Sequence, residues 1–277
     1  QKNIEAFLAF LWDIQLKIGH SVRSISDCVS AAKKDVTIAT NIMETRTICG
    51  IDAIRNNMLK KTSPDRIWPL KLWPSGEFFK AKLLEQAKRH AKHGNTEYNL
   101  EPNIKEAPGG LRDIQTINWE AKRHFRINSI EELIGDNFIT PEEYLQLKRN
   151  EAFLWRVRYA VHLIAGRPEE KLTFDHQRKI AKMFGYKDGE KRLGVEQFMQ
   201  HYYQVVLSIR ELTDTLFQCL SQEILYNKKS EEKKLSGPCT STFSSSFPTT
   251  FFQNLLFYSR QSECGDLSIA KRRKDRS

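Results

Sequence analysis

From Leu111 to Leu225 the chain repeats apolar residues at intervals of three and four, the period of an α-helix with one buried face. Four such stretches follow one another with short intervals between them: 111–125, 139–166, 173–185 and 193–225. Helices joined by short loops pack into bundles. This part of the chain is therefore predicted to be a four-helix-type bundle.

The residues before this region have mixed patterns. Residues 3–16 have helical apolar spacing, whereas residues 17–24 alternate apolar or aromatic side chains with small or polar ones, as a half-buried strand does. Ser24 or Ser26 can cap a helix running to Gly50, and Ser75 can cap a basic helix beyond a proline-rich loop. The predicted fold class is α+β, mostly α.

A Pro-Gly-Gly turn stands at the start of the helical region, in the stretch IKEAPGGLRDI. Gly109 and Gly110 allow positive φ or close approach of a ligand, and Arg112 and Asp113 fall in the first turn of the next helix. Backbone N–H groups at a helix N-terminus favour a phosphate, to which Lys105 would add charge. The alternative is an ordinary turn whose helix is capped by its own aspartate.

A second candidate is the predicted strand, where His20, Ser21 and Arg23 point in alternate directions. One face of such a strand can reach a phosphate while the other packs. The alternative is a histidine whose hydrogen bonds are satisfied at a strand end.

Two further polar groups are interpreted as structural. His90 lies on a basic helix without carboxylates near it in sequence, which indicates a solvated face. Arg156 and Arg158 either form a substrate-facing patch or pair with Glu169 and Glu170, and ion pairing is the simpler explanation.

The charge of the chain does not indicate nucleic-acid binding. The formal net charge is +10, but from Lys228 onward there are 10 Lys/Arg against 5 Asp/Glu, so half of the excess lies in the last 50 residues. Residues 227–277 replace helical periodicity with Ser/Thr clusters and scattered Phe. They are predicted to be disordered or out of frame with the preceding coding sequence.

The cysteines and the hydropathy indicate the cellular compartment of the chain. Five cysteines stand far apart with no C-x-x-C pair, which suits free thiols in the cytoplasm. No window approaches the roughly 20 apolar residues that a membrane helix needs. We expect no membrane association.

Several stretches, taken in order, resemble one family. These are LWDIQLKIGHSVRSISDC, KKDVTIATNIMETRTICG, FFKAKLLEQAKRHAKHGNTEYNLEPNIKEAPGGLRDIQTINW, RVRYAVHLIAGRPEEKLTFDHQRKIAKMFGY and LGVEQFMQHYY. They resemble the bacterial bifunctional uridylyltransferase/uridylyl-removing enzymes that modify the PII nitrogen-signalling protein, from about Ile4 to about Leu220. A shorter form of IKEAPGGLRDI is also similar to a stretch of the glutamine synthetase adenylyltransferases.

The resemblance implies a partial nucleotidyltransferase domain in residues 1–108, a helical domain in residues 109–226 and a tail outside the fold. The implied reaction moves UMP from UTP onto a tyrosine of PII, with Mg²⁺ holding the triphosphate. The metal-binding Asp-x-Asp pair of the family is expected before the first residue, and its uridylyl-removing HD domain and glutamine-sensing ACT domains after about residue 225. The fragment is therefore expected to be inactive alone.

Site residues are carried over from the family by position. The residues expected to line the nucleotide are Lys105, Gly109, Gly110, Arg112, Asp113, His20, Ser21 and Arg23, with no metal ligand among them. The bundle is expected to present PII. Two other functions stay open at this point: a non-catalytic helical module that binds PII, and an enzyme like the adenylyltransferases.

Overall fold

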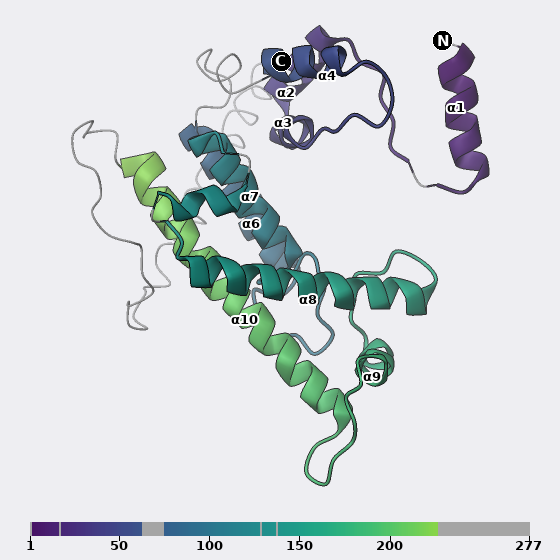
Figure 1. Cartoon of the computed structure of the whole chain (residues 1–277), viewed down its shortest axis with the longest axis vertical. Coiled ribbons are helices and arrows are strands. Elements are labelled where there is room, and N and C mark those ends of the chain that lie inside the picture. Colours follow the sequence, from purple (N-terminus) through teal and green to yellow (C-terminus); the bar gives the residue numbers. More distant parts are fainter. Residues whose placement is uncertain (1, 17, 63–74, 128, 137, 227–277) are drawn as a thin grey trace, which may run out of the picture. The chain divides into compact units, whose positions relative to one another are not determined.

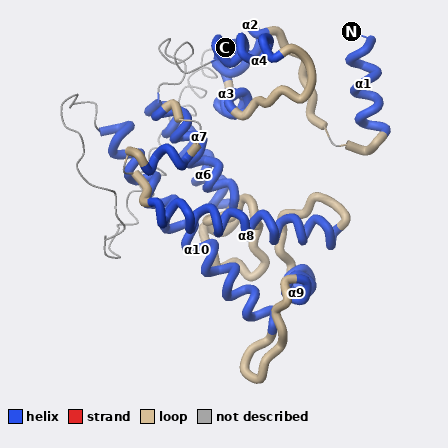
Figure 2. The backbone as a smooth tube through the Cα atoms, in the orientation of Figure 1, coloured by secondary structure: helices blue, strands red, loops and turns tan. Residues whose placement is uncertain are grey.

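The computed structural model describes residues 2–16, 18–62, 75–127, 129–136 and 138–226 of the chain. Within these ranges all regular elements are helices, as the blue tubes of Figure 2 show, and extended backbone pairs only in an isolated bridge between Asn103 and Lys171. The chain divides into two compact units, Gln1–Pro74 and Ser75–Ser277. In the parts described, no helix combines the length and apolar character needed to cross a membrane.

The first unit contains α1 (Lys2–Asp13), α2 (Ile25–Lys34), α3 (Val36–Met43) and α4 (Asp52–Thr62). Its small core consists of Cys28, Ala32, Ala39 and Ile42. Four side chains of this size bury little apolar area, so this unit has only a modest hydrophobic driving force of its own.

Caps explain where the helices of the first unit begin. Ser24 and Asp27 form a capping box at the start of α2, as the sequence predicts for Ser24. Asp35 then leaves the helical conformation, with φ −140° and ψ 118°, and its carboxylate accepts the Thr37 N–H at 2.7 Å. The single helix expected from Ser24 to Gly50 is therefore two helices, because an aspartate able to cap a new helix interrupts it.

The second unit contains α6 (Ser75–Lys92), α7 (Leu111–Phe125), η1 (Ile130–Ile134), α8 (Pro141–Ala165), α9 (Phe174–Met183), α10 (Gly194–Ser221) and a short π-helical turn, η2 (Gln222–Tyr226). Helix α10 packs against α7, α8 and α9, while α6 packs against α7. Figure 1 shows α8 crossing α10, with α6 and α7 side by side. The four helices predicted after Leu111 are confirmed.

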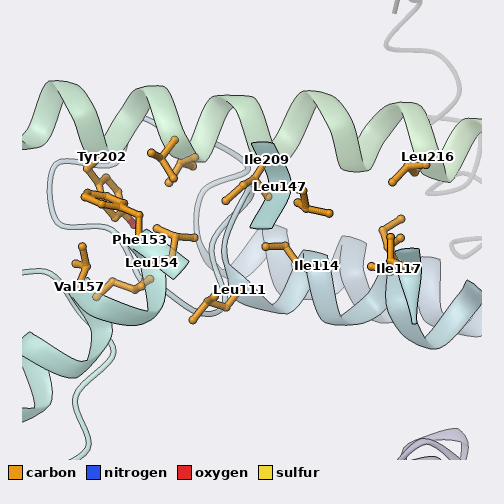
Figure 3. Packing of buried hydrophobic residues seen from close by; sticks show 14 of the residues in the cluster. Leu111, Ile114, Ile117, Leu147, Phe153, Leu154, Val157, Tyr202, Ile209 and Leu216 are labelled. Carbon is orange, nitrogen blue, oxygen red and sulfur yellow. The ribbon is translucent and has the colours of Figure 1, made fainter. Parts of the chain in front are cut away.

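One continuous core joins these helices. Figure 3 shows side chains of α7, α8 and α10 interleaved, with Ile114 and Ile117 of α7 facing Ile209 and Leu216 of α10. Each fully buried aliphatic side chain of this kind contributes about 1.5–3 kcal/mol relative to exposure. The second unit therefore has a substantial core of its own.

The mostly-α class is confirmed, but the predicted strand was wrong and one helix was missed. Residues 18–23 form no strand, and Val22 is 74% exposed, because alternation stabilises a strand only where a neighbouring strand pairs with it. The β component of the α+β class is thus absent from the described residues, which are helical. Helix α4 was not predicted, since its apolar spacing is weak.

The remaining expectations about architecture stay predictions. These are the nucleotidyltransferase fold, the four-helix arrangement and the functional domain boundaries. The structural boundary falls after Pro74, and α6 packs with the helices that follow it. Most of the predicted proline-rich loop, and the whole tail 227–277, lie outside the described residues.

Candidate functional site

The carboxylate of Asp113 is the centre of the turn that precedes α7. It is 1% exposed and accepts hydrogen bonds from Gln86 Nε2 at 3.1 Å, Arg89 Nη2 at 2.7 Å and the Gly109 N–H at 2.8 Å. His90 Nε2 lies 2.9 Å from the same carboxylate. One aspartate thereby ties three side chains of α6 to the turn.

Burial and these contacts shift the pKa of Asp113 in opposite directions. Burial penalises the charged carboxylate, but the hydrogen bond from His90 and the charges of His90 and Arg89 outweigh it. The pKa of Asp113 is therefore held below its usual value. Asp113 is a buried anion that stabilises the turn, with almost no surface to offer a ligand.

Gly109 is required by the path of the backbone. Its φ is +73°, and a Cβ added there would lie 2.3 Å from the backbone oxygen of Val206 on α10. A Cβ at Gly110 would lie 2.8 Å from the carbonyl oxygens of Lys105 and Ala107. The predicted positive φ is confirmed for Gly109, whereas Gly110 has an extended conformation with φ −80°.

The first turn of α7 has its backbone amides engaged within the turn. The N–H groups of Gly110, Leu111 and Arg112 donate to the carbonyls of Ala107, Ile104 and Lys105 at 2.9, 3.2 and 2.9 Å. The Gly109 amide donates to Asp113. A helix N-terminus binds an anion through unpaired amides, and the amides of this turn are engaged within it. The contact of the turn with a nucleotide phosphate stays a prediction.

Two basic side chains beside the turn have accessible surface. The Arg112 guanidinium is 25% exposed, donates to Gln115 at 2.8 Å and lies 3.4 Å from Glu106. Lys105 is 29% exposed, with its Nζ 3.6 Å from the same carboxylate. Glu106 therefore brings Lys105 and Arg112 together beside the turn.

His20, Ser21 and Arg23 belong to the first unit and lie on an irregular, exposed segment between α1 and α2. The His20 ring meets Trp12 edge-on, with 5.4 Å between ring centroids. The expectation that these side chains alternate across a strand was wrong. Their contact with a nucleotide stays a prediction.

Sequence reasoning missed the role of His90. It was expected on a solvated face, yet its ring is 18% exposed and bonded to Asp113. The contact joins residues 23 positions apart, which no local pattern shows. The expected pairing of Arg158 with Glu170 is confirmed by a 2.7 Å bond from Nε.

A second buried polar group on α7 was not predicted. Glu120 is fully buried, and neither of its carboxylate oxygens accepts a hydrogen bond within the described part of the chain. Burial raises its pKa well above the usual range, although the charges of Lys82 and Arg123 oppose this shift. The Lys82 ammonium, 2% exposed, pairs with Glu85 at 3.0 Å and lies 4.7 Å from the Trp119 ring centroid.

The described residues do not form a magnesium site. No three His, Cys, Asp or Glu side chains gather as metal ligands in the ranges that the structure describes. Mg²⁺ prefers carboxylate oxygens, and the carboxylate of Asp113 is already occupied by cationic and amide donors.

Fold and site together define a helical protein domain organised around a Pro-Gly-Gly-Leu-Arg-Asp turn. A family model described as GlnD PII-uridylyltransferase matches residues 77–217, which contain this turn and the helices around it. The chain belongs to this family.

Relatives extend the similarity into the first unit. The chain is 51% identical over 225 residues to the bifunctional uridylyltransferase/uridylyl-removing enzyme of Pseudomonas aeruginosa strain LESB58, covering 81% of this chain and 24% of that protein. For the enzyme of the same name from Stutzerimonas stutzeri strain A1501, the identity is 49% over 230 residues, covering 83% and 25%. The chain spans about a quarter of the length of these curated relatives. No solved structure matches it.

Proposed function

We propose that this chain is part of a PII uridylyltransferase, in which it helps to bind UTP and presents the PII protein. The observation that carries the proposal is the family match over residues 77–217, together with about 50% identity to uridylyltransferase/uridylyl-removing enzymes. The enzyme would move UMP from UTP to a tyrosine of PII, with Mg²⁺ neutralising the triphosphate. Cytoplasmic localisation is part of the proposal.

The chain alone is proposed to be inactive. Phosphoryl transfer depends on charge neutralisation around the phosphates, and the sequence has no Asp-x-Asp pair to hold a metal. The family model that matches residues 77–217 is described as a PII-uridylyltransferase, which supports UTP over ATP as the nucleotide.

The residues predicted to line the nucleotide fall into two groups, those with exposed side chains and those that are buried in the turn. Arg112 and Lys105 have side-chain surface to meet a phosphate, and their shared partner Glu106 holds both beside the turn. Gly109, Gly110 and Asp113 are proposed to act indirectly, by fixing the turn that carries Arg112. His20, Ser21 and Arg23 are proposed to contribute from the first unit.

Binding of radiolabelled UTP to the purified chain tests the role of Arg112. A charge-assisted hydrogen bond contributes about 1.5–3 kcal/mol, so Arg112→Ala should weaken binding about tenfold or more. Arg178→Ala is the matched control, because that guanidinium is 71% exposed on α9 and distant in sequence from the turn. Equal affinity in the Arg112 variant and the wild type would remove Arg112 from the site.

Transfer of labelled UMP to purified PII, with UTP and Mg²⁺, tests the activity. Binding of PII without transfer is the expected result. Transfer by the chain alone would overturn its proposed inactivity, and preferential binding of ATP would favour the adenylyltransferase alternative. Binding of PII with no affinity for any nucleotide would favour the non-catalytic module.

A further inference from the structure

Helix α8 exposes a line of large side chains on one face. Trp155, Tyr159 and Leu163 follow one another at intervals of four residues and are 41%, 67% and 61% exposed. Residues four apart lie on the same side of a helix, so the three form one stripe along the C-terminal half of α8. We call these three residues the α8 stripe.

The α8 stripe is not part of the core. The buried side of the same helix carries Phe153, Leu154 and Val157, which Figure 3 shows packed together with Tyr202 of α10. Core packing therefore uses other positions of α8. Large apolar side chains left in one line on a surface mark interaction sites more often than scattered ones do.

The surroundings of the α8 stripe are basic. Between Ala152 and Arg167 the sequence contains three arginines and no carboxylate. Arg158 is paired with Glu170, and Arg167, although 73% exposed, is paired with Glu169 at 3.1 Å. Arg156 is exposed and lies 5.0 Å from the ring centroid of Phe184. Trp, Tyr and Arg are the residues most enriched in binding hot spots, and an apolar centre with a charged rim is the usual anatomy of an interface.

This charge pattern argues against a second copy of the chain as the occupant. A two-fold symmetric contact would set the patch against itself and bring the exposed Arg156 of both copies into one interface. Like charges opposed across an interface cost several kcal/mol. The complementary partner presents carboxylates around an apolar patch.

Size also distinguishes the kinds of partner. The α8 stripe has three large side chains, and transient complexes have smaller interfaces than permanent assemblies. A protein substrate must bind, react and leave, which is what a small apolar centre with a charged rim permits.

We propose that the α8 stripe is the docking surface for PII, which would present an acidic rim around an apolar patch. This inference rests on the proposed function and adds the location and chemistry of the contact. Docking through Tyr159 and Leu163 supplies affinity, while Arg156 steers the approach of the acidic partner.

The test measures the affinity of purified PII for the whole chain and for point variants, by surface plasmon resonance at two salt concentrations. Tyr159→Ala and Leu163→Ala should each weaken binding about tenfold. Arg156→Glu should lower the association rate, whereas Arg156→Lys should largely retain it. Met183→Ala is the matched control, since Met183 is 54% exposed on α9, outside the stripe.

The outcomes separate this inference from the proposed function. If wild-type chain binds PII and the stripe variants bind equally well, the docking surface is overturned while the proposed function stands. A wild-type chain that does not bind PII overturns both. If sedimentation shows a dimer that Tyr159→Ala dissociates, the stripe binds a second copy of the chain. If the stripe variants lose binding to anionic vesicles but keep binding to PII, the stripe binds a membrane. Either result overturns the proposal.

Discussion

The guanidinium of Arg89 donates to the carboxylate of Asp113 at 2.7 Å, and this contact joins α6 to the first turn of α7. Both side chains are largely buried, at 10% and 1% exposed. Arg89 also donates to the carbonyl of Glu106 at 3.0 Å, so it holds both ends of the turn that contains Gly109. The turn is therefore fixed by charges from another helix as well as by its own sequence.

Replacing Asp113 by Asn should destabilise the second unit. Removing one partner of a buried ion pair leaves the other charge uncompensated, at a cost of about 3–5 kcal/mol. Urea unfolding followed by circular dichroism measures the change. Asp175→Asn is the control, because Asp175 is 82% exposed and 4.0 Å from Arg178, and its loss should cost at most about 1 kcal/mol. Equal stabilities of the two variants would contradict the role given to Asp113.

The same carboxylate predicts a loss of stability in acid. The pKa of Asp113 is lower in the folded chain than its usual value of 3.8, because contacts with His90 and Arg89 outweigh burial. Its contribution is therefore complete above that value and is lost as the pH falls through the folded-state pKa. The difference in unfolding free energy between wild type and Asp113→Asn should shrink below pH 4. A difference that stays constant from pH 2 to pH 6 would show that the charge does not stabilise the fold.

Gly109→Ala should lower the free energy of unfolding more than the same change at another glycine with positive φ. At Gly109 a Cβ would meet the backbone of Val206 at 2.3 Å, whereas at Gly166, with φ +63°, nothing lies within 4 Å. Gly166→Ala should cost about 1–2 kcal/mol for the left-handed conformation alone. Gly109→Ala adds overpacking, for a total of about 3 kcal/mol or more. Thermal unfolding compares the two, and similar melting temperatures would argue against close packing of the turn on α10.

Helices and their ends were the part of the fold that the sequence could predict. Helix α8 begins where Thr140 and Glu143 form a capping box, and it ends at Gly166 in the left-handed conformation. Both signals lie within a few residues of the boundary that they determine. The strand expected at residues 18–23 failed because a strand needs a partner elsewhere in the chain, which alternation does not reveal.

For the candidate site, the sequence could predict the backbone conformation of the turn but not its side-chain contacts. Positive φ at Gly109 follows from a glycine after proline, but the reason for it, contact with Val206, joins residues almost a hundred positions apart. His90 looked solvated because its carboxylate partner, Asp113, is remote in sequence. The amides that the sequence left free for a phosphate are engaged by carbonyls and a carboxylate of the turn itself.

Glu120 predicts a pH dependence opposite in sign to that of Asp113. Burial raises its folded-state pKa well above the usual 4.5, so the folded chain retains a proton that the unfolded chain releases. Stability is complete below the unfolded-state pKa and falls as the pH rises toward the folded-state pKa, by up to about 1.4 kcal/mol per pH unit. Glu120→Gln should reduce this dependence between pH 5 and pH 8, because the amide cannot ionise. Glu211→Gln, at an exposed position of α10, should leave the wild-type slope in place. Urea unfolding at each pH measures the slopes, and a wild-type slope retained by the Glu120 variant would mean that another group titrates.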